Sequence, residues 1–293
     1  MSDFDGDKDY SSFTAKRVTP YLGAELEGID LTKPLSPIQA DELRDALARF
    51  QVIFFRDQPI SHDAHKDLGR LFGPLAIHSA VAGIDGHPEI VAIHADADSK
   101  YVAGEGWHSD LSAYEAPPLG SILYLHTIPE TGGDTMFSSM YKAYDALSDR
   151  MKAYLDGLEA VHDANPVYHA LFKDYDKRYP VATHPVIRTH PVTGKKCIFV
   201  NSSYTTRIEG IPSEESDALL KFLFDHVKNP NFQVRFQWQP HSIAFWDNRA
   251  VQHLAVWDYF PEVRSGYRVT IAGDKPFSGA LQSQKLETVA STV

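Results

Sequence analysis

Apolar residues along the chain follow two periods, one typical of helices and one typical of strands. Residues 36–50 carry apolar side chains three or four positions apart, and they begin with the serine, proline and glutamine of a helix start, so they predict a helix. The uninterrupted apolar run 52–55 predicts a buried strand. A second helix is predicted from the Ser61 cap to Gly73-Pro74.

Strand patterns dominate the rest of the chain. Residues 232–238 alternate large apolar with polar side chains, which is the period of a strand with one buried face. Further strands are predicted in the segments 121–127, 135–137, 186–189, 197–201, 243–246 and 267–271, and helices in 148–158 and 213–227. Without internal repeats or a shift in composition, this pattern predicts one domain, mainly β with flanking helices, built as an antiparallel sandwich or barrel.

Two long stretches, residues 75–106 and 160–180, show no clear period. Irregular stretches of this length in a compact domain are often binding loops, so we expect lids over a site. We also expect a flexible N-terminal segment over residues 1–15, a single domain over 16–278 and a C-terminal tail over 279–293.

Composition and charge restrict the class of protein. The chain has 293 residues, 43% of them hydrophobic, and a formal net charge of -11, which argues against nucleic acid or an anionic membrane surface as the main partner. No apolar run approaches the roughly 20 residues that span a bilayer. The N-terminus lacks the apolar core of a signal peptide, and a single cysteine, Cys197, excludes an internal disulfide. We therefore expect a cytoplasmic protein.

The stretch Trp107-His108-Ser109-Asp110 is a candidate metal site. In an extended strand, His108 and Asp110 point to one face and offer an imidazole nitrogen and a carboxylate oxygen to a divalent metal. His253, which follows a predicted strand and turn, could supply a third ligand. Two histidines and one carboxylate on a β-scaffold form a facial triad that leaves positions open on iron. Each residue alone could equally be a hydrogen-bonded or surface side chain.

Other histidines and arginines are further candidates for a site. The chain lacks the His-Glu-x-x-His motif of zinc proteases, and His62 and His65 lie on the polar face of a predicted helix, where solvation is expected. Arg264 and Arg268 follow His253 in a strand pattern. A buried arginine is costly unless an anion pairs with it, so these two either bind a carboxylate or sulfonate ligand or are surface residues that balance an acidic protein.

Five motifs together resemble a known family. They are Trp107-His-Ser-Asp110, Gly132-Gly-Asp-Thr135, Phe199-Val-Asn201 with Thr206-Arg207-Ile208, Trp246-Asp-Asn-Arg249 leading to His253, and Gly273-Asp-Lys-Pro-Phe277. In order and spacing, from about residue 18 to 277, they resemble the taurine dioxygenase-like (TauD/TfdA) group of Fe(II)- and 2-oxoglutarate-dependent dioxygenases. The resemblance implies a double-stranded β-helix, or jelly roll, and O2 as the oxidant.

The resemblance also assigns roles to individual residues. It implies that His108, Asp110 and His253 ligate the iron and form the catalytic centre. Thr135 and Arg264 match the pair that holds the distal carboxylate of 2-oxoglutarate.

The substrate residues match the family less completely. Arg268 and His78 match residues that bind the anionic head of the prime substrate. Ser79, however, replaces a proline that usually follows this histidine, and the segment 102–106 lacks the asparagine that taurine dioxygenases present to the substrate amine. These departures argue against taurine itself.

The activity implied is hydroxylation of a small anionic organic substrate, with succinate and CO2 as co-products. An alkyl sulfonate or sulfate ester is favoured, with release of sulfite or sulfate. The alternatives are a related oxygenase acting on a carboxylate such as an aryloxyalkanoate, and a non-catalytic β-sandwich binding protein. The family also implies a homo-oligomer, either a dimer or a tetramer.

Overall fold

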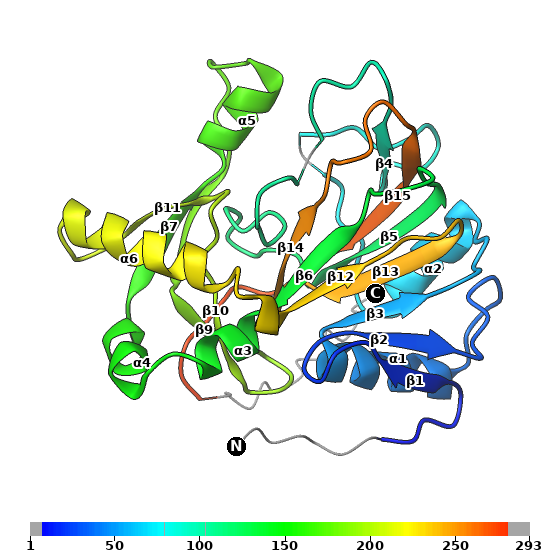
Figure 1. Ribbon diagram of the computed structural model, residues 1–293, viewed down its shortest axis with the longest axis horizontal. Coiled ribbons are helices and arrows are strands. Elements are labelled where there is room, and N and C mark those ends of the chain that lie inside the picture. The colour runs from blue at the N-terminus through cyan, green and yellow to red at the C-terminus, as the bar shows by residue number, and fades with distance from the viewer. Residues whose placement is uncertain (1–7, 79, 103, 281–293) are drawn as a thin grey trace, which may run out of the picture.

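Two β-sheets that face each other form the centre of the molecule (Figure 1). The computed structural model describes residues 8–78, 80–102 and 104–280. In this part of the chain the larger sheet has the strand order β1 (Thr14–Arg17), β2 (Ala24–Glu27), β3 (Val52–Phe55), β13 (Ser242–Asp247), β5 (Gly120–Thr127), β15 (Arg264–Ile271) and β4 (Ile90–Ala95). The facing sheet has the order β12 (Gln233–Phe236), β6 (Thr135–Ser139) and β14 (Val251–Ala255).

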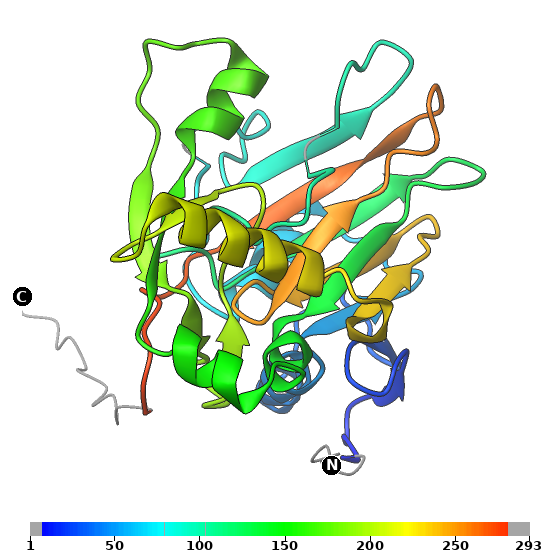
Figure 2. The same ribbon diagram turned by 60° about the vertical axis from the view of Figure 1, so that its left-hand side comes forward.

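Smaller sheets and helices flank this pair. The small sheets are β11 (Thr205–Ile208), β7 (Glu159–Asp163) and β8 (Val181–Pro185), and β10 (Lys196–Ile198) with β9 (Ile187–Thr189). The helices are α1 (Pro37–Phe50), α2 (His62–Arg70), α3 (Met140–Asp145), α4 (Asp149–Leu155), α5 (Asn165–Phe172), α6 (Ser213–His226) and the 3-10 helix η1 (Pro230–Phe232). In Figure 2, α6 (yellow) crosses in front of the sheets.

The core lies on both faces of the larger sheet. Phe54 and Leu125 of this sheet pack against the facing sheet, where the ring of Phe236 stacks on that of Phe54 with centroids 4.0 Å apart. On the other face, Ile53 and Phe55 pack against α1. Because β3 is covered on both sides, all four of its residues are buried, which explains its uninterrupted apolar run. The mainly β jelly roll predicted from the sequence is confirmed.

Local signals placed the early elements correctly. The Ser36 hydroxyl accepts a hydrogen bond from the Gln39 amide at 3.3 Å, and the Gln39 side chain accepts one from the Ser36 amide at 2.8 Å, so α1 begins with the predicted capping box. Helix α2 begins after the predicted Ser61 cap but ends at Arg70, before the predicted Gly73-Pro74.

The two stretches read as irregular contain regular elements. Residues 75–106 include β4, an outer strand that pairs on one side with β15 and alternates poorly. Residues 160–180 include most of β7 and all of α5, which starts without a side-chain cap because Ala164 occupies the N-cap position. Helix α3 was also not predicted.

Ordered packing reaches into the segment expected to be flexible. Glu42 accepts hydrogen bonds from the amides of Ser11, at 2.7 Å, and Ser12, at 2.9 Å, and β1 begins at Thr14. Residues 1–7 and 281–293 of the expected terminal segments, and Ser79, lie outside the described residues. Among the helices described, none has the length and apolar character needed to cross a membrane.

Buried His65 makes the stability of the fold depend on pH. The expectation that His65 is solvated is wrong, because it is 1% exposed on α2 and its Nε2 donates to the carbonyl oxygen of Ile122 at 3.0 Å. Burial lowers the pKa of His65 from 6.5 to about 4, so on acidification the unfolded chain takes up the proton first. We expect this group's contribution to be complete above pH 6.5 and to fall by about 3 kcal/mol between pH 6.5 and 4.

Urea denaturation at pH 7 and pH 4 measures the loss. A His65→Gln variant, which keeps a side-chain N–H but does not titrate, should lose less stability over the same interval. Equal losses in the two proteins would assign the pH dependence to other groups.

Candidate metal centre

The fold brings His108, Asp110 and His253 into one buried cluster. One ligand atom from each residue lies within 4.8 Å of the others. The Asp110 Oδ1 atom is 3.6 Å from His108 Nε2 and 3.8 Å from His253 Nε2. When two ligand atoms are each bound at about 2.1 Å to the same metal ion, they lie roughly 3–4 Å from each other. The spacings in this cluster therefore fit a single ion.

A backbone bridge sets the two histidines side by side. His253 lies in the middle of β14, and its amide donates to the His108 carbonyl oxygen at 2.9 Å, while the His108 amide donates to the His253 carbonyl oxygen at 3.1 Å. The two ring centroids are 4.1 Å apart. The predicted extended strand from His108 to Asp110 is wrong beyond this one bridge, because Asp110 begins a turn and Leu111 has a left-handed φ of 50°.

The charge states of the cluster suit a divalent metal. His108 Nδ1 lies 2.8 Å from the Gly106 carbonyl oxygen and donates to it, which leaves the lone pair on Nε2. Burial and the neighbouring His108 lower the pKa of His253 to about 3, so its ring is neutral at pH 7. Burial alone would raise the pKa of Asp110, but Arg268 and His253 hold it well below its usual range. Two imidazoles and one carboxylate match the iron-binding facial triad.

Two residues that the sequence interpretation missed hold Asp110. Ser121 Oγ donates to Asp110 Oδ2 at 2.9 Å, and Asn248 Oδ1 accepts from the Asp110 amide at 2.6 Å. Asn248 belongs to a motif that we interpreted as a turn and as part of the family resemblance, with no role for Asn248 itself. A short polar side chain between two buried strands could have indicated a role beyond turn formation.

Thr135 and Arg264 also meet, each at the first residue of its strand, β6 and β15. Arg264, 4% exposed, donates from Nε to the Gly133 carbonyl oxygen at 2.9 Å and from Nη2 to Thr135 Oγ1 at 3.3 Å. Trp238 Nε1 donates to the same hydroxyl at 3.0 Å. These hydrogen bonds of the guanidinium go to neutral acceptors, so a buried positive charge is left to be balanced by an anion.

Strand pairing relates this pair to the metal cluster. Thr135 lies opposite Ala255 of β14, and Phe137 lies opposite His253. Opposite residues and residues two apart share a face, so Thr135 points to the same side as His253. The two positions are separated by two residues along the strand, roughly 7 Å.

The structure also brings Arg268 and His78 close to the metal cluster. Arg268 Nη1 lies 3.2 Å from Asp110 Oδ1, and its buried Nε has no hydrogen-bond partner among the described residues. His78 Nδ1 accepts from the amides of Ala80, at 3.1 Å, and Val81, at 3.0 Å, so its proton lies on Nε2. Burial and then the charge of Arg268 lower the pKa of His78 to about 4. His78 is therefore a neutral donor near a cation.

Comparisons with known proteins agree with this geometry. The family described as taurine catabolism dioxygenase TauD, TfdA family matches residues 14–270. Over 277 residues the chain is 34% identical to an alpha-ketoglutarate-dependent (2-oxoglutarate-dependent) sulfonate dioxygenase of Saccharomyces cerevisiae, covering 89% of this chain and 67% of that protein. Over 268 residues it is 32% identical to an alpha-ketoglutarate-dependent sulfate ester dioxygenase of Pseudomonas putida, covering 87% of this chain and 88% of that protein.

Solved structures give the same result for the fold. A taurine dioxygenase from Burkholderia xenovorans superposes with a TM-score of 0.81 at 38% identity, covering 92% of this chain and 94% of that chain. The family match spans both facing sheets and includes every predicted site residue. The chain therefore belongs to the TauD/TfdA family of 2-oxoglutarate-dependent dioxygenases.

Proposed function

We propose that His108, Asp110 and His253 hold the Fe(II) of this dioxygenase and that its prime substrate is a small organic anion, either an alkyl sulfonate or a sulfate ester. The observation that carries this proposal is the position of Arg268. Its guanidinium lies 3.2 Å from the Asp110 carboxylate, and its buried Nε has no hydrogen-bond partner among the described residues. Such a donor beside a metal site suits an anionic head group.

The family requires Fe(II), 2-oxoglutarate and O2. When bound, the iron and 2-oxoglutarate supply O2 activation coupled to oxidative decarboxylation, which yields succinate and CO2 and an oxygen atom for a substrate C–H bond. The protein's own residues orient the two organic molecules and exclude water.

Arg264 and Thr135 would bind the distal carboxylate of 2-oxoglutarate. Thr135 is fixed by Trp238, and Arg264 is fixed by the Gly133 carbonyl, so both donors are held before the ligand arrives. The spacing of roughly 7 Å between the strand positions of Thr135 and His253 suits a five-carbon dicarboxylate that also reaches the metal.

Arg268 and His78 would bind the substrate anion with donors from two sides. A carbon next to the sulfonate or ester oxygen would then face the metal cluster. Hydroxylation of that carbon gives an unstable product that collapses to a carbonyl compound and releases sulfite or sulfate.

Gly104, in the segment 102–106 that lacks the asparagine of taurine dioxygenases, supports a substrate other than taurine. Gly104 has a φ of 92°, and a Cβ built there would lie 3.1 Å from His108 Cε1. A side chain for binding a substrate amine therefore has little space at this position. The two relatives named above act, by name, on a sulfonate and on a sulfate ester.

A substrate panel tests the proposal. We expect succinate formation to rise severalfold above the uncoupled rate with alkyl sulfonates or alkyl sulfate esters, with stoichiometric sulfite or sulfate and weaker stimulation by taurine. The Asp110→Ala variant serves as the background. Stimulation by aryloxy acids alone would assign a carboxylate substrate. Failure to bind Fe(II) and 2-oxoglutarate under anaerobic conditions would indicate a non-catalytic protein.

A further inference from the structure

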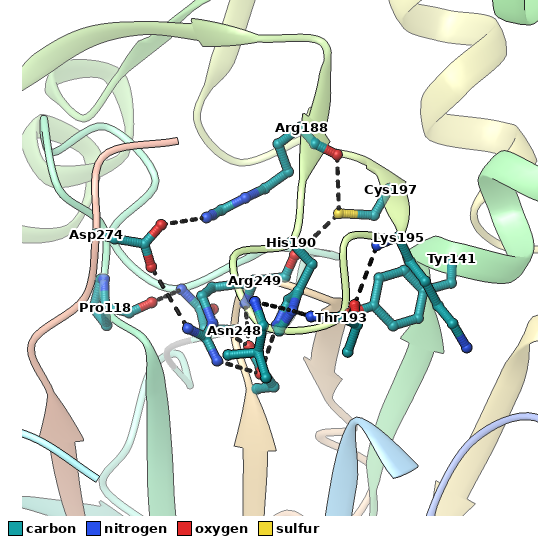
Figure 3. Close-up of polar contacts among 12 residues, drawn as sticks. Pro118, Tyr141, Arg188, His190, Thr193, Lys195, Cys197, Asn248, Arg249 and Asp274 are labelled. Carbon is teal, nitrogen blue, oxygen red and sulfur yellow. Dashed lines mark hydrogen bonds and ion pairs between the residues drawn. The ribbon is translucent and has the colours of Figure 1, made fainter. Parts of the chain in front are cut away.

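One side-chain amide holds the main chain of a proposed metal ligand. Asn248 Oδ1 accepts from the Asp110 amide at 2.6 Å, and Asn248 Nδ2 donates to the Asp110 carbonyl oxygen at 2.9 Å. The same Nδ2 donates to the Pro118 carbonyl oxygen at 3.2 Å, as Figure 3 shows. Asn248 is 1% exposed, so water does not compete for these bonds.

Asp110 is the ligand that most needs such support. His108 and His253 fix each other through two backbone hydrogen bonds, whereas Asp110 lies in a turn. The next residue, Leu111, has a left-handed φ of 50°, a conformation that costs free energy in a non-glycine residue and persists only where the surroundings impose it. The side chain of Asn248 satisfies both main-chain groups of Asp110 at this point.

A buried ionic network fixes the turn that carries Asn248 (Figure 3). Arg249 donates to both carboxylate oxygens of Asp247, at 2.8 and 2.7 Å, and His190 Nε2 lies 2.9 Å from Asp247 Oδ2. Asp274 then links Arg249, at 3.6 Å, to Arg188, at 2.9 Å.

The orientation of the Asn248 amide follows from its partners. The main-chain N–H of Asn248 donates to the Leu119 carbonyl oxygen at 2.9 Å, so the main chain of Asn248 is anchored as well. If the side-chain amide were flipped, its Nδ2 would face the Asp110 N–H, and two donors would oppose each other. Only the orientation seen in the structure therefore satisfies both hydrogen bonds to Asp110. Of the common replacements, aspartate lacks the donor and serine is too short to reach both groups.

We propose that Asn248 is a positioning residue that sets the place of the Asp110 carboxylate and thereby the metal affinity of the site. The proposal rests on the proposed function, because it takes Asp110 as a metal ligand. Residues that orient metal ligands typically contribute about 10- to 100-fold in metal affinity.

The test measures Mn(II) affinity, as a stand-in for Fe(II), by electron paramagnetic resonance of the free ion. In Asn248→Ala and Asn248→Ser we expect the dissociation constant to rise about 10- to 100-fold. Gln58→Ala is the matched control, because the Gln58 amide accepts from Leu31 N at 2.8 Å and donates to Ile29 O at 3.2 Å and Arg56 O at 3.1 Å. Gln58 lies near the opposite end of β13 from Asn248.

The control separates positioning from general stability. We expect Gln58→Ala to lower the melting temperature, as the Asn248 variants do, while leaving Mn(II) affinity unchanged. Wild-type affinity in a folded Asn248 variant, an equal loss in Gln58→Ala, or failure of both Asn248 variants to fold would overturn the proposal. Absence of Mn(II) binding in the wild-type protein would instead refute the metal site itself.

Discussion

Replacing Asp110 with alanine is expected to reduce succinate formation to background, a loss of about 10³-fold or more. The reason is that this carboxylate is the anionic member of the proposed ligand set, and metal catalysis lowers the barrier by several kcal/mol. His108→Ala and His253→Ala should give the same loss. The measurement is succinate production at saturating Fe(II) and 2-oxoglutarate, together with Mn(II) binding.

Controls distinguish loss of the metal from loss of the fold. Asp110→Asn keeps the size of the side chain, and Asp217→Ala removes an exposed carboxylate from α6. The first should be nearly inactive but folded by circular dichroism, and the second should match the wild-type protein. If any single ligand variant kept more than about a tenth of the wild-type rate, less than 1.4 kcal/mol of barrier would have been lost, and the proposed ligand set would be wrong.

Arg264→Ala and Arg268→Ala are expected to affect different Michaelis constants. Loss of Arg264 should raise the Michaelis constant for 2-oxoglutarate about 100-fold, because a buried, charge-assisted pair worth up to about 3 kcal/mol is removed. Loss of Arg268 should mainly raise the constant for the prime substrate. Steady-state kinetics with each substrate varied in turn measures both effects.

Because Arg268 contacts Asp110, the metal affinity of the Arg268 variant has to be measured beside its kinetics. Arg268→Ala also removes a cation 3.2 Å from a proposed metal ligand, so Mn(II) affinity should be determined for the same variant. Arg268→Lys keeps the positive charge but loses the planar guanidinium that can donate two parallel hydrogen bonds. Relative to Arg268→Ala, it should restore substrate binding only in part. If both alanine variants shifted the same constant, the division of roles between the two arginines would be wrong.

The sequence predicted those parts of the fold that depend on local signals. The start of α1 followed from Ser36 and Gln39, whose capping bonds lie within three residues of each other. Strand β4 and helix α5 were missed because their signals are weak: β4 is paired on one side, and α5 starts at Ala164 without a polar cap. Their formation depends on distant partners that no short window contains.

The sequence predicted the proposed metal ligands but not the residues that hold them in place. The residue pattern suggested His108, Asp110 and His253, and the resemblance assigned them as ligands. The structure brings them together, although through a bridge and a turn rather than the expected strand. Asn248 and Ser121 were not predicted, because their bonds to Asp110 depend on the three-dimensional packing of segments separated in the chain.

The long sequence separation within the site has a consequence for how the protein acquires its metal. Asp110 and the amide that holds it are 138 residues apart, and β14, which carries His253, follows that amide. Contacts of such high sequence separation form late in folding, after the loop-closure entropy has been overcome. During synthesis, Asp110 and His108 therefore leave the ribosome long before their partners, and a nascent chain lacking β13 and β14 has no complete metal site. Metal loading is then a step that only the nearly finished fold can perform.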